Sequence, residues 1–212
     1  MSTLHYFYDP FCGWCYGAAP IISIADKIEG LTIQPHGIGM LSGNKSKMMS
    51  PEWRDFVRPH EERIHALSGQ EFGEAYTAGI QERRDVLLDS SRPIAAMLAA
   101  QTQGGTGIPM LKRLQKAYYL EGLVITDLNV IANLAEELGY ERQDFIEQYQ
   151  NVLVAGVDAH IKDSHRSMAE AGKQGVPAFI LEHKGEYHEL PFGHFISRPE
   201  KITGAIKAIL EN

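Results

Sequence analysis

Both cysteines of the chain lie in one short stretch, DPFCGWCYG, with two residues between them. If this stretch opens a helix, Cys12 and Cys15 are about one turn apart. Unpaired N–H groups and the positive end of the helix dipole stabilise a thiolate at such a position. A thiolate is the nucleophile in disulfide exchange and also the better leaving group. The pattern predicts Cys12 as the exposed nucleophile and Cys15 as the more buried cysteine that resolves a mixed disulfide.

Two other interpretations of this cysteine pair are a metal site and a pair of structural thiols. A tetrahedral zinc site needs four ligands, and the chain has no second CxxC. The histidines of HEERIH, His60 and His65, are five residues apart rather than the four of a metalloprotease helix, and we interpret them as a solvated helix face. Structural thiols are often inert, but two cysteines alone in a chain seldom reach this spacing by accident. We therefore expect redox chemistry and no metal.

The residues around the pair have the pattern of a strand, a helix and a second strand. Residues 4–9 are rich in aromatic side chains and predict a buried strand. From Cys12 to Glu29 apolar residues recur at helical spacing, with a kink expected at Pro20. Residues 31–39 again have strand character. This order favours a parallel pair of strands joined by a crossover helix.

The middle of the chain, residues 42–150, changes to the short loops and repeated 3.6-residue periodicity of a packed helical bundle. Ser50, Ser91 and Asp127 stand where helices are expected to start and are of the types that cap helices. No sequence repeat or low-complexity linker interrupts this region.

The end of the chain returns to mixed structure. A helical pattern runs over residues 145–173, and residues 175–191 predict two strands around a Lys-Gly turn. Ser197 and Glu200 form a capping-box pattern before a last apolar helix, with Pro199 in its expected first turn.

Composition places the chain among globular proteins, with 44% hydrophobic and 22% charged residues. A net charge of −7 argues against nucleic acid or an anionic membrane as a partner. The first residues lack the basic and apolar segments of a secretory signal, and no apolar run approaches the roughly 18 residues that span a bilayer. We expect a cytoplasmic protein, in which a CxxC is catalytic, redox-sensing or metal-binding rather than a structural disulfide.

A second candidate feature is Val176-Pro177, which follows Gly175 and precedes the apolar run AFIL. Proline is tolerated at the first residue of a strand, so one interpretation is a plain loop-to-strand junction. In the other, a cis Val176–Pro177 bond lies opposite the cysteines. The preceding backbone is then turned outward, and Val176 offers its N–H and C=O groups to an extended substrate segment.

This order of elements, with FCGWC after the first strand and GVPAFIL before the third, resembles the DsbA-like branch of the thioredoxin-fold thiol–disulfide oxidoreductases. It is most similar to the cytosolic members labelled FrnE-like or protein-disulfide isomerases. The resemblance covers nearly the whole chain. It implies an α/β, thioredoxin-like domain formed by residues 1–41 and 151–212 and interrupted by an all-helical insertion, residues 42–150. We expect the insertion to form one wall of a groove beside the CxxC.

The resemblance also implies roles for individual residues. It makes Cys12 the nucleophile, Cys15 the resolving cysteine and Pro177 a cis proline. The wider candidate site assigns Trp14, Val176 and Pro177 to substrate binding and adds Phe11 and Gly13 as supporting residues. Trp14 either contacts substrate or fills the rim of the helix end. The implied substrates are cysteine-containing proteins or small thiols. No dissociable cofactor is expected beyond glutathione as a redox partner. The chain is expected to be a monomer or a homodimer.

The sequence departs from the family pattern at two positions. Well-studied members carry a buried acid six residues before the first cysteine, where this chain has Tyr6. A phenol is a poor proton acceptor at neutral pH, so the base for Cys15 is unassigned. Gly13-Trp14 replaces the Pro-His of strongly oxidising members, which predicts a less oxidising couple. We expect Asp9-Pro10 to shape the turn into the helix, and His194 is a further candidate proton donor.

Two rival functions stay open. One is a glutathione-dependent enzyme resembling the kappa-class glutathione transferases and 2-hydroxychromene-2-carboxylate isomerases, which share this architecture. Those enzymes typically carry serine at the nucleophile position and no CxxC, so Cys12 and Cys15 argue against it. The other is a redox-controlled or chaperone-like binding protein that uses the groove without catalysis.

Overall fold

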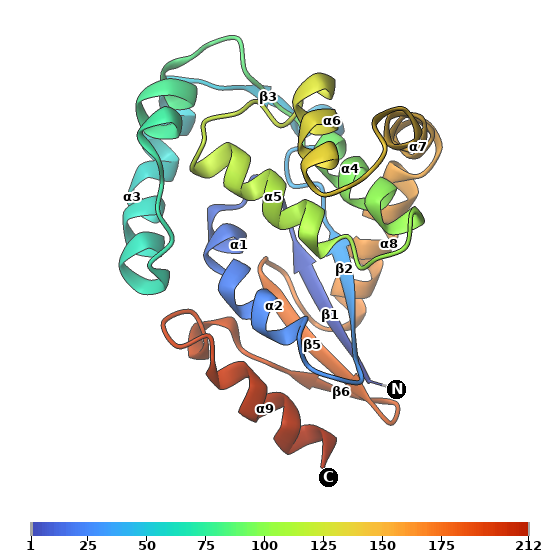
Figure 1. Ribbon diagram of the computed structural model, residues 1–212. Helices are drawn as coiled ribbons and strands as arrows, with labels where there is room; N and C mark the ends of the chain where they lie inside the picture. Colours follow the sequence, from blue (N-terminus) through green and yellow to red (C-terminus); the bar gives the residue numbers. More distant parts are fainter. Residues whose placement is uncertain (1, 212) are drawn as a thin grey trace.

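A mixed four-stranded sheet in the order β2-β1-β5-β6 organises the computed structural model, which describes residues 2–211 (Figure 1). β1 (Ser2–Tyr8) and β2 (Leu31–Gly37) are parallel. β5 (Ala178–His183) runs antiparallel to β1, and β6 (Glu186–Glu189) runs antiparallel to β5. The predicted parallel pair and the predicted hairpin are both confirmed.

Two short helices, rather than one, connect β1 to β2. They are α1 (Gly13–Gly17) and α2 (Ala19–Ala25). The break falls at Ala18, because Pro20 in the first turn of α2 has no N–H with which to continue the hydrogen bonds of α1. The interruption expected at Pro20 is confirmed, whereas the predicted extension of the helix to Glu29 is wrong.

The chain between β2 and β5 is mostly helical, as predicted (Figure 1). Its longer helices are α3 (Pro51–Ser68), α4 (Ser91–Thr102), α5 (Ile108–Tyr119), α6 (Leu128–Glu137), α7 (Arg142–Ala155) and α8 (Val157–Glu170). Shorter elements are the paired strands β3 (Lys47–Met48) and β4 (Leu87–Leu88), the 3-10 turns η1 (Gly43–Lys45) and η3 (Ile80–Glu82), and the π turn η2 (Ala75–Gly79). The domain boundaries given above stay a prediction, and the second of them falls inside α7.

The observed starts of the helices confirm some of the predicted N-terminal caps and not others. The Ser50 side chain accepts the N–H of Trp53, and the Asp127 side chain accepts two N–H groups of the first turn of α6, so the helix start predicted at Ser50 and the cap predicted at Asp127 are both confirmed. Ser91 is the first residue of α4 rather than its cap. The helical pattern predicted over 145–173 is divided at Gly156 between α7 and α8.

The predicted capping box near the C-terminus does not form. The last helix, α9 (Lys201–Leu210), begins after Glu200, which makes no side-chain capping bond. Ser197 lies outside the helix, because the backbone from η4 (Phe192–His194) onward is already engaged in successive turn hydrogen bonds, including those from Arg198 to Phe195 and from Lys201 to Arg198.

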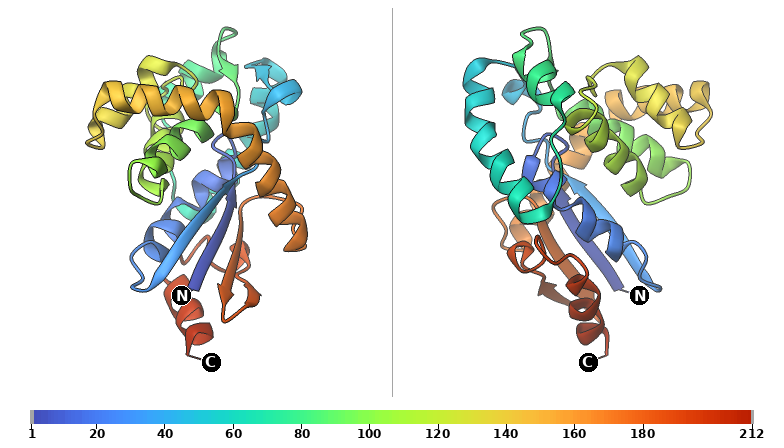
Figure 2. Two further views of the ribbon diagram at one scale, coloured as in Figure 1. Left: turned by 90° about the vertical axis from the view of Figure 1, so that its right-hand side faces the viewer. Right: turned by 60° about the vertical axis from the view of Figure 1, so that its left-hand side comes forward.

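Alternation along β1 places helices on both faces of the sheet. Leu4, Tyr6 and Tyr8 point into a core shared with α2 and α9, whereas Phe7 points to the opposite face and packs with Met168 of α8. Figure 2 shows α8 and α2 on opposite sides of the strands. This confirms the predicted α/β class. No helix within residues 2–211 is long and apolar enough to cross a membrane.

Candidate active site

Cys12 lies where β1 turns into α1. It is the N-cap residue of α1, and its carbonyl accepts the N–H groups of Cys15 and Tyr16 at 2.9 and 3.1 Å. Its own N–H donates to the carbonyl of Asp9 at 3.1 Å. These short-range bonds fix both cysteines, which are free thiols, on one helical turn. Cys12 keeps 8% of its surface exposed and Cys15 none, which is the predicted order of exposure.

Burial changes the proton affinity of Cys15. Desolvation raises its pKa well above the usual value for a thiol, and the adjacent Cys12 sulfur, to which it hydrogen-bonds, adds to this rise. The backbone N–H of Asp9, which hydrogen-bonds to the Cys15 sulfur, acts in the opposite direction. The net effect keeps Cys15 protonated at neutral pH. Its attack on another sulfur therefore requires a proton acceptor.

Val176 and Pro177 lie opposite the cysteines. The peptide bond between them is cis, as the second interpretation of this stretch expected. The Cys12 thiol donates a hydrogen bond to the Val176 carbonyl oxygen, with 3.8 Å between sulfur and oxygen. The loop before β5 thus brings a backbone acceptor to the more exposed of the two thiols.

Cys12 opens into a cavity of about 370 Å³. Most of the side chains around it are apolar or aromatic, and they come from the first turn of α1 and the residue before Cys12, the segment after β2, one face of α3, η2, the end of α5 and the loop before β5. The lining residues are Phe11, Cys12, Gly13, Trp14, Ile38, Met40, Trp53, Phe56, Val57, His60, Glu61, Ile64, Tyr76, Tyr118, Tyr119, Gln174, Gly175 and Val176. The helical segment after β2 therefore forms one wall beside the CxxC, through α3.

Trp14 lies at the rim of this cavity. Its ring meets the rings of His60 and Phe192 edge-on, with centroids 6.4 and 6.3 Å away, and the Arg63 guanidinium lies 5.7 Å from its centre. His60 is half-buried and lines the cavity, so the interpretation of HEERIH as a solvated face is correct for the exposed His65 and wrong for His60. His194 is exposed and lies outside the cavity lining.

Phe11 and Gly13 flank Cys12 and shape its surroundings. The Phe11 ring meets Tyr118 edge-to-face, with centroids 5.0 Å apart. A Cβ added at Gly13 would lie 3.1 Å from the Cδ1 of Ile64, so the absence of a side chain lets α3 approach α1 closely. Both residues thus help to set the distance between Cys12 and the α3 wall.

Asp9 has a larger part in the site than shaping a turn. Its side chain is fully buried, with Oδ1 accepting from Phe11 N and Ser90 Oγ at 2.9 Å each and Oδ2 accepting from Met40 N at 2.6 Å. Burial raises the pKa of this carboxyl to about 6, although the three hydrogen bonds act against the rise. Asp9 is therefore charged at neutral pH but more basic than an ordinary aspartate.

Two tyrosines of β1 lie near the buried thiol. The Tyr6 hydroxyl donates to the Cys15 carbonyl at 3.3 Å, and burial raises the pKa of Tyr6 well above its usual value. The buried Tyr8 hydroxyl has no hydrogen-bond partner within residues 2–211. Burial raises the pKa of Tyr8 well above its usual value, and the charges of Asp9 and Cys15 add to this rise.

The sequence-based reasoning did not assign Glu61 or the tyrosines that surround it. Residues 53, 56, 57, 60, 61 and 64 recur at three- and four-residue intervals, and all of them line the cavity from α3. This spacing was visible in the sequence, but only the fold shows that the face covers Cys12. Within the described chain, no group of three or more His, Cys, Asp or Glu side chains is arranged to hold a metal ion.

Comparison with known proteins agrees with this arrangement. The family described as DSBA-like thioredoxin domain matches residues 3–206. A cytosolic disulfide reductase, DsbM from Pseudomonas aeruginosa, has a solved structure that matches with a TM-score of 0.91 and 38% identity, covering 99% of this chain and 98% of that one. A structure of that protein with GSH matches with a TM-score of 0.90 and 35% identity over 99% and 100% of the two chains.

More distant similarity concerns the fold alone. A 2-hydroxychromene-2-carboxylate isomerase matches with a TM-score of 0.59 and 15% identity, over 98% of this chain and 94% of that one. No curated protein is significantly similar in sequence. The matches confirm the thioredoxin-like fold with its helical insertion.

Proposed function

Because the chain belongs to the DSBA-like thioredoxin domain family of thiol–disulfide oxidoreductases, we propose that Cys12 and Cys15 are its redox-active pair and that it reduces disulfides with electrons from a small thiol. One observation carries this proposal. Cys12 faces an apolar cavity and a backbone acceptor on Val176, while Cys15 lies fully buried directly behind it. A substrate sulfur in the cavity meets Cys12 first.

The reducing direction and the small thiol are supported by the similarity to DsbM, a cytosolic disulfide reductase whose structure has also been solved with GSH. At 38% identity over 99% of this chain, the whole architecture is shared. We propose glutathione as the thiol and the cytosol as the location. Gly13-Trp14 between the cysteines is consistent with a couple that is not strongly oxidising.

The first step is attack by the Cys12 thiolate on one sulfur of the substrate disulfide. The substrate S–S bond breaks, its distal sulfur leaves as a thiolate and takes a proton, and a mixed disulfide forms on Cys12. Apolar groups next to the substrate sulfur are removed from water by the aromatic walls, which favours binding. Val176 can pair with an extended substrate backbone beside the mixed disulfide.

The second step is resolution by Cys15. Its proton passes to Asp9, and the Cys15 thiolate attacks the Cys12 sulfur and releases the second substrate thiol. Asp9 suits this role because its buried carboxylate acts electrostatically on the Cys15 thiol and its pKa of about 6 lies close to neutral pH. Tyr6, with its strongly raised pKa, only holds the Cys15 carbonyl.

Two small thiols restore the pair. The first attacks the Cys12–Cys15 disulfide and forms a mixed disulfide on Cys12, and the second attacks that mixed disulfide and leaves as oxidised dimer with the first. One substrate disulfide thus gains two electrons and two protons, and two glutathione molecules lose them. The cycle returns both cysteines to the thiol form.

An equilibrium redox titration against glutathione tests the proposal, with thiol alkylation and the fluorescence of Trp14 and Trp53 as the two readouts. We expect a reversible two-electron transition that is absent in Cys12→Ser. A midpoint near or below about −270 mV supports a reductase, whereas one near about −120 to −180 mV indicates an oxidase or isomerase and contradicts the proposed direction. Two thiols without a reversible transition would exclude the exchange mechanism altogether.

A further inference from the structure

Glu61 places one buried carboxylate in the wall of the cavity beside Cys12. Glu61 is only 7% exposed, although the other acidic residues of α3 face solvent. Among the described residues it is the sole acidic side chain that lines this cavity, and no lysine or arginine lines it. The proposed function above uses Cys12, Cys15 and Asp9 but gives Glu61 no part.

The hydrogen bonds of Glu61 leave one acceptor position open. Its Oε1 accepts from the Tyr76 hydroxyl at 2.7 Å and from Gln81 Nε2 at 3.1 Å, and its Oε2 accepts from the same Gln81 nitrogen at 2.9 Å. The orientation of the Gln81 amide is fixed because its oxygen accepts from Arg58 Nε at 3.0 Å. A carboxylate offers about four acceptor positions, and three are used here. The remaining position is on Oε2.

The charge of Glu61 has no direct counter-ion. Within residues 2–211 it forms no ion pair, and the guanidinium of the nearby Arg58 is bonded to Gln81, to Glu82 at 3.1 Å and to the carbonyl of Thr77. Burial raises the pKa of Glu61, while the hydrogen bonds from Tyr76 and Gln81 and the positive fields of Arg58 and His60 act against the rise. A buried carboxylate held by neutral donors is a favourable partner for a cation that enters the cavity.

Aromatic rings surround the same part of the cavity. Tyr76 and Tyr118 meet edge-to-face with centroids 5.0 Å apart, and Trp53 and Phe56 line the α3 side. The faces of such rings attract ammonium groups, and the ring of Trp53 already carries one, the Nζ of Lys47 at 4.1 Å from its centroid. Tyr119 lines the cavity together with Cys12 and Glu61. The nucleophilic cysteine and the buried carboxylate residue therefore border one shared cavity.

From this juxtaposition we propose that Glu61 binds an ammonium group on the compound whose sulfur reacts with Cys12. The inference rests on the proposed function and narrows its substrate class to disulfides of aminothiols, or of peptides that carry an amine close to the disulfide. An anionic group placed next to Glu61 would instead face a carboxylate, and no lysine or arginine is among the residues that line the cavity. Neutral disulfides leave the Glu61 charge buried and unpaired.

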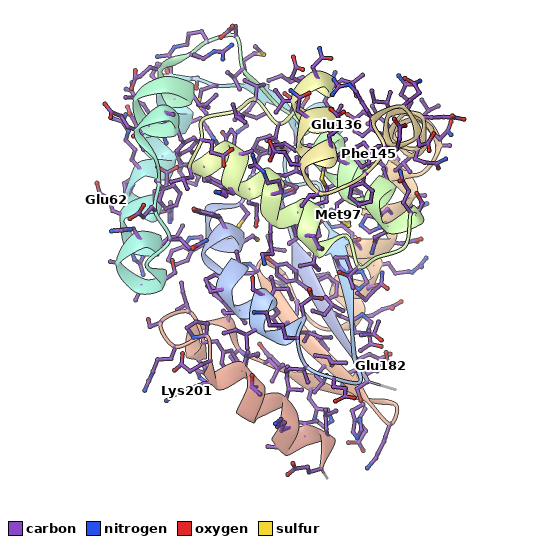
Figure 3. All side chains as sticks on the ribbon, in the orientation of Figure 1. Glu62, Met97, Glu136, Phe145, Glu182 and Lys201 are labelled. Carbon is purple, nitrogen blue, oxygen red and sulfur yellow. The ribbon has the colours of Figure 1, made fainter. Side chains whose placement is uncertain are left out.

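The test compares symmetrical ω-aminoalkyl disulfides with ω-hydroxyalkyl disulfides of matched length, in a glutathione-coupled reductase assay. The kcat/KM ratio of each amine to its hydroxyl partner is measured for the wild type, for Glu61→Gln and for the control Glu62→Gln. Glu62 is exposed on the outer side of α3 and does not line the cavity (Figure 3). Comparing ratios between variants cancels the different leaving-group reactivities of the two thiols.

We expect the amine-to-hydroxyl ratio to fall by about tenfold in Glu61→Gln, the size typical of losing a hydrogen bond to a charged group, and to stay at the wild-type value in Glu62→Gln. An unchanged ratio in Glu61→Gln overturns the ammonium site, and so does an equal fall in both variants, which would reflect a long-range charge effect. A wild-type protein that reduces none of the disulfides refutes the proposed function itself, and the ammonium site falls with it.

A second measurement covers the case in which Glu61→Gln fails to fold. In the wild type, a simple alkylammonium ion should slow the alkylation of Cys12 by neutral iodoacetamide, and the matched alkyl alcohol should not. Equal protection by both compounds, or by neither, overturns the proposal without any variant.

Discussion

The Cys12 thiol hydrogen-bonds to the carbonyl oxygen of Val176 across 3.8 Å, although the two residues are 164 positions apart. The first lies at the N-terminal end of α1 and the second in the loop that leads into β5. Pairing of β1 with β5 brings these two loops together, because Phe7 of β1 lies opposite Ala178, two residues after Val176. The redox centre is therefore assembled from both ends of the chain.

Separate replacement of the two cysteines should give different failures. Cys12→Ser should abolish disulfide reduction, because it removes the thiol that faces the cavity. Cys15→Ser should still react once with a disulfide and then stop as a mixed disulfide on Cys12, since no resolving thiol remains. Intact-protein mass spectrometry after exposure to oxidised glutathione distinguishes the two. A glutathione adduct on Cys12→Ser would contradict the assignment.

Asp9→Asn should slow resolution rather than the first attack. The variant keeps an oxygen acceptor for the turn but cannot take the Cys15 proton, so we expect mixed disulfide to accumulate and turnover to fall about 100-fold. In the wild type, the resolution rate should decline as the pH falls below about 6, where Asp9 becomes protonated. Rapid-quench alkylation at several pH values measures both effects.

Ser90→Ala is the matched control for this change. It removes one of the three donors to Asp9 but keeps the carboxylate. Because that hydrogen bond lowers the pKa of Asp9, its loss should move the decline of the resolution rate to higher pH. Asp9→Asn with a wild-type pH profile would indicate that Asp9 only positions the turn.

Asp9 should also make the folded state less stable as the pH rises. Its folded pKa of about 6 lies above the ordinary 3.8, so between these values the native protein holds a proton that the unfolded chain has lost. Stability from this group is complete below the lower value and is lost as the pH rises through the higher one. The shift corresponds to about 3 kcal/mol at most.

Urea unfolding of the wild type and Asp9→Asn at about pH 3.5 and about pH 7.5 measures this effect. The free energy of unfolding of the wild type, relative to the variant, should fall by up to about 3 kcal/mol between the two pH values. Subtracting the value of the variant from that of the wild type at each pH cancels the contributions of the other titrating groups. A difference that does not change with pH, or that changes in the opposite sense, would show that Asp9 has no raised pKa.

Gly73→Ala should destabilise the contact between the Gly73 backbone and the end of α5, where Tyr119 lines the cavity. An added Cβ would lie 2.0 Å from the carbonyl oxygen of Leu120, and Gly73 itself donates its N–H to the Tyr119 carbonyl at 2.9 Å. The backbone must move, at a cost of about 1–3 kcal/mol. Gly204→Ala in α9 is the control, because nothing lies within 4 Å of its added Cβ and alanine favours a helix. Equal stability of the two variants in chemical unfolding would contradict the close approach at Gly73.

Expectations based on short-range patterns were mostly correct. Short-range patterns of residue types predicted β1, β2 and the Lys-Gly hairpin. They also predicted the helix starts at Ser50 and Asp127, where each side chain bonds to N–H groups only two or three residues away. The predicted cap at Ser197 was wrong because it, too, was based on a local pattern alone. A capping pattern is a local possibility, and the turns that follow β6 use the backbone differently.

The sequence by itself determined the chemistry available to this protein: two thiols at helical spacing, a strand before them and a proline before a later strand. Tertiary structure decided what surrounds them. Asp9 and Glu61 look like any acidic residues in the sequence, and they become buried only because distant segments close over them. Burial removes water, so it sets their proton affinities and their need for partners. The base for Cys15 and the shape of the cavity therefore depend on contacts that no local pattern encodes.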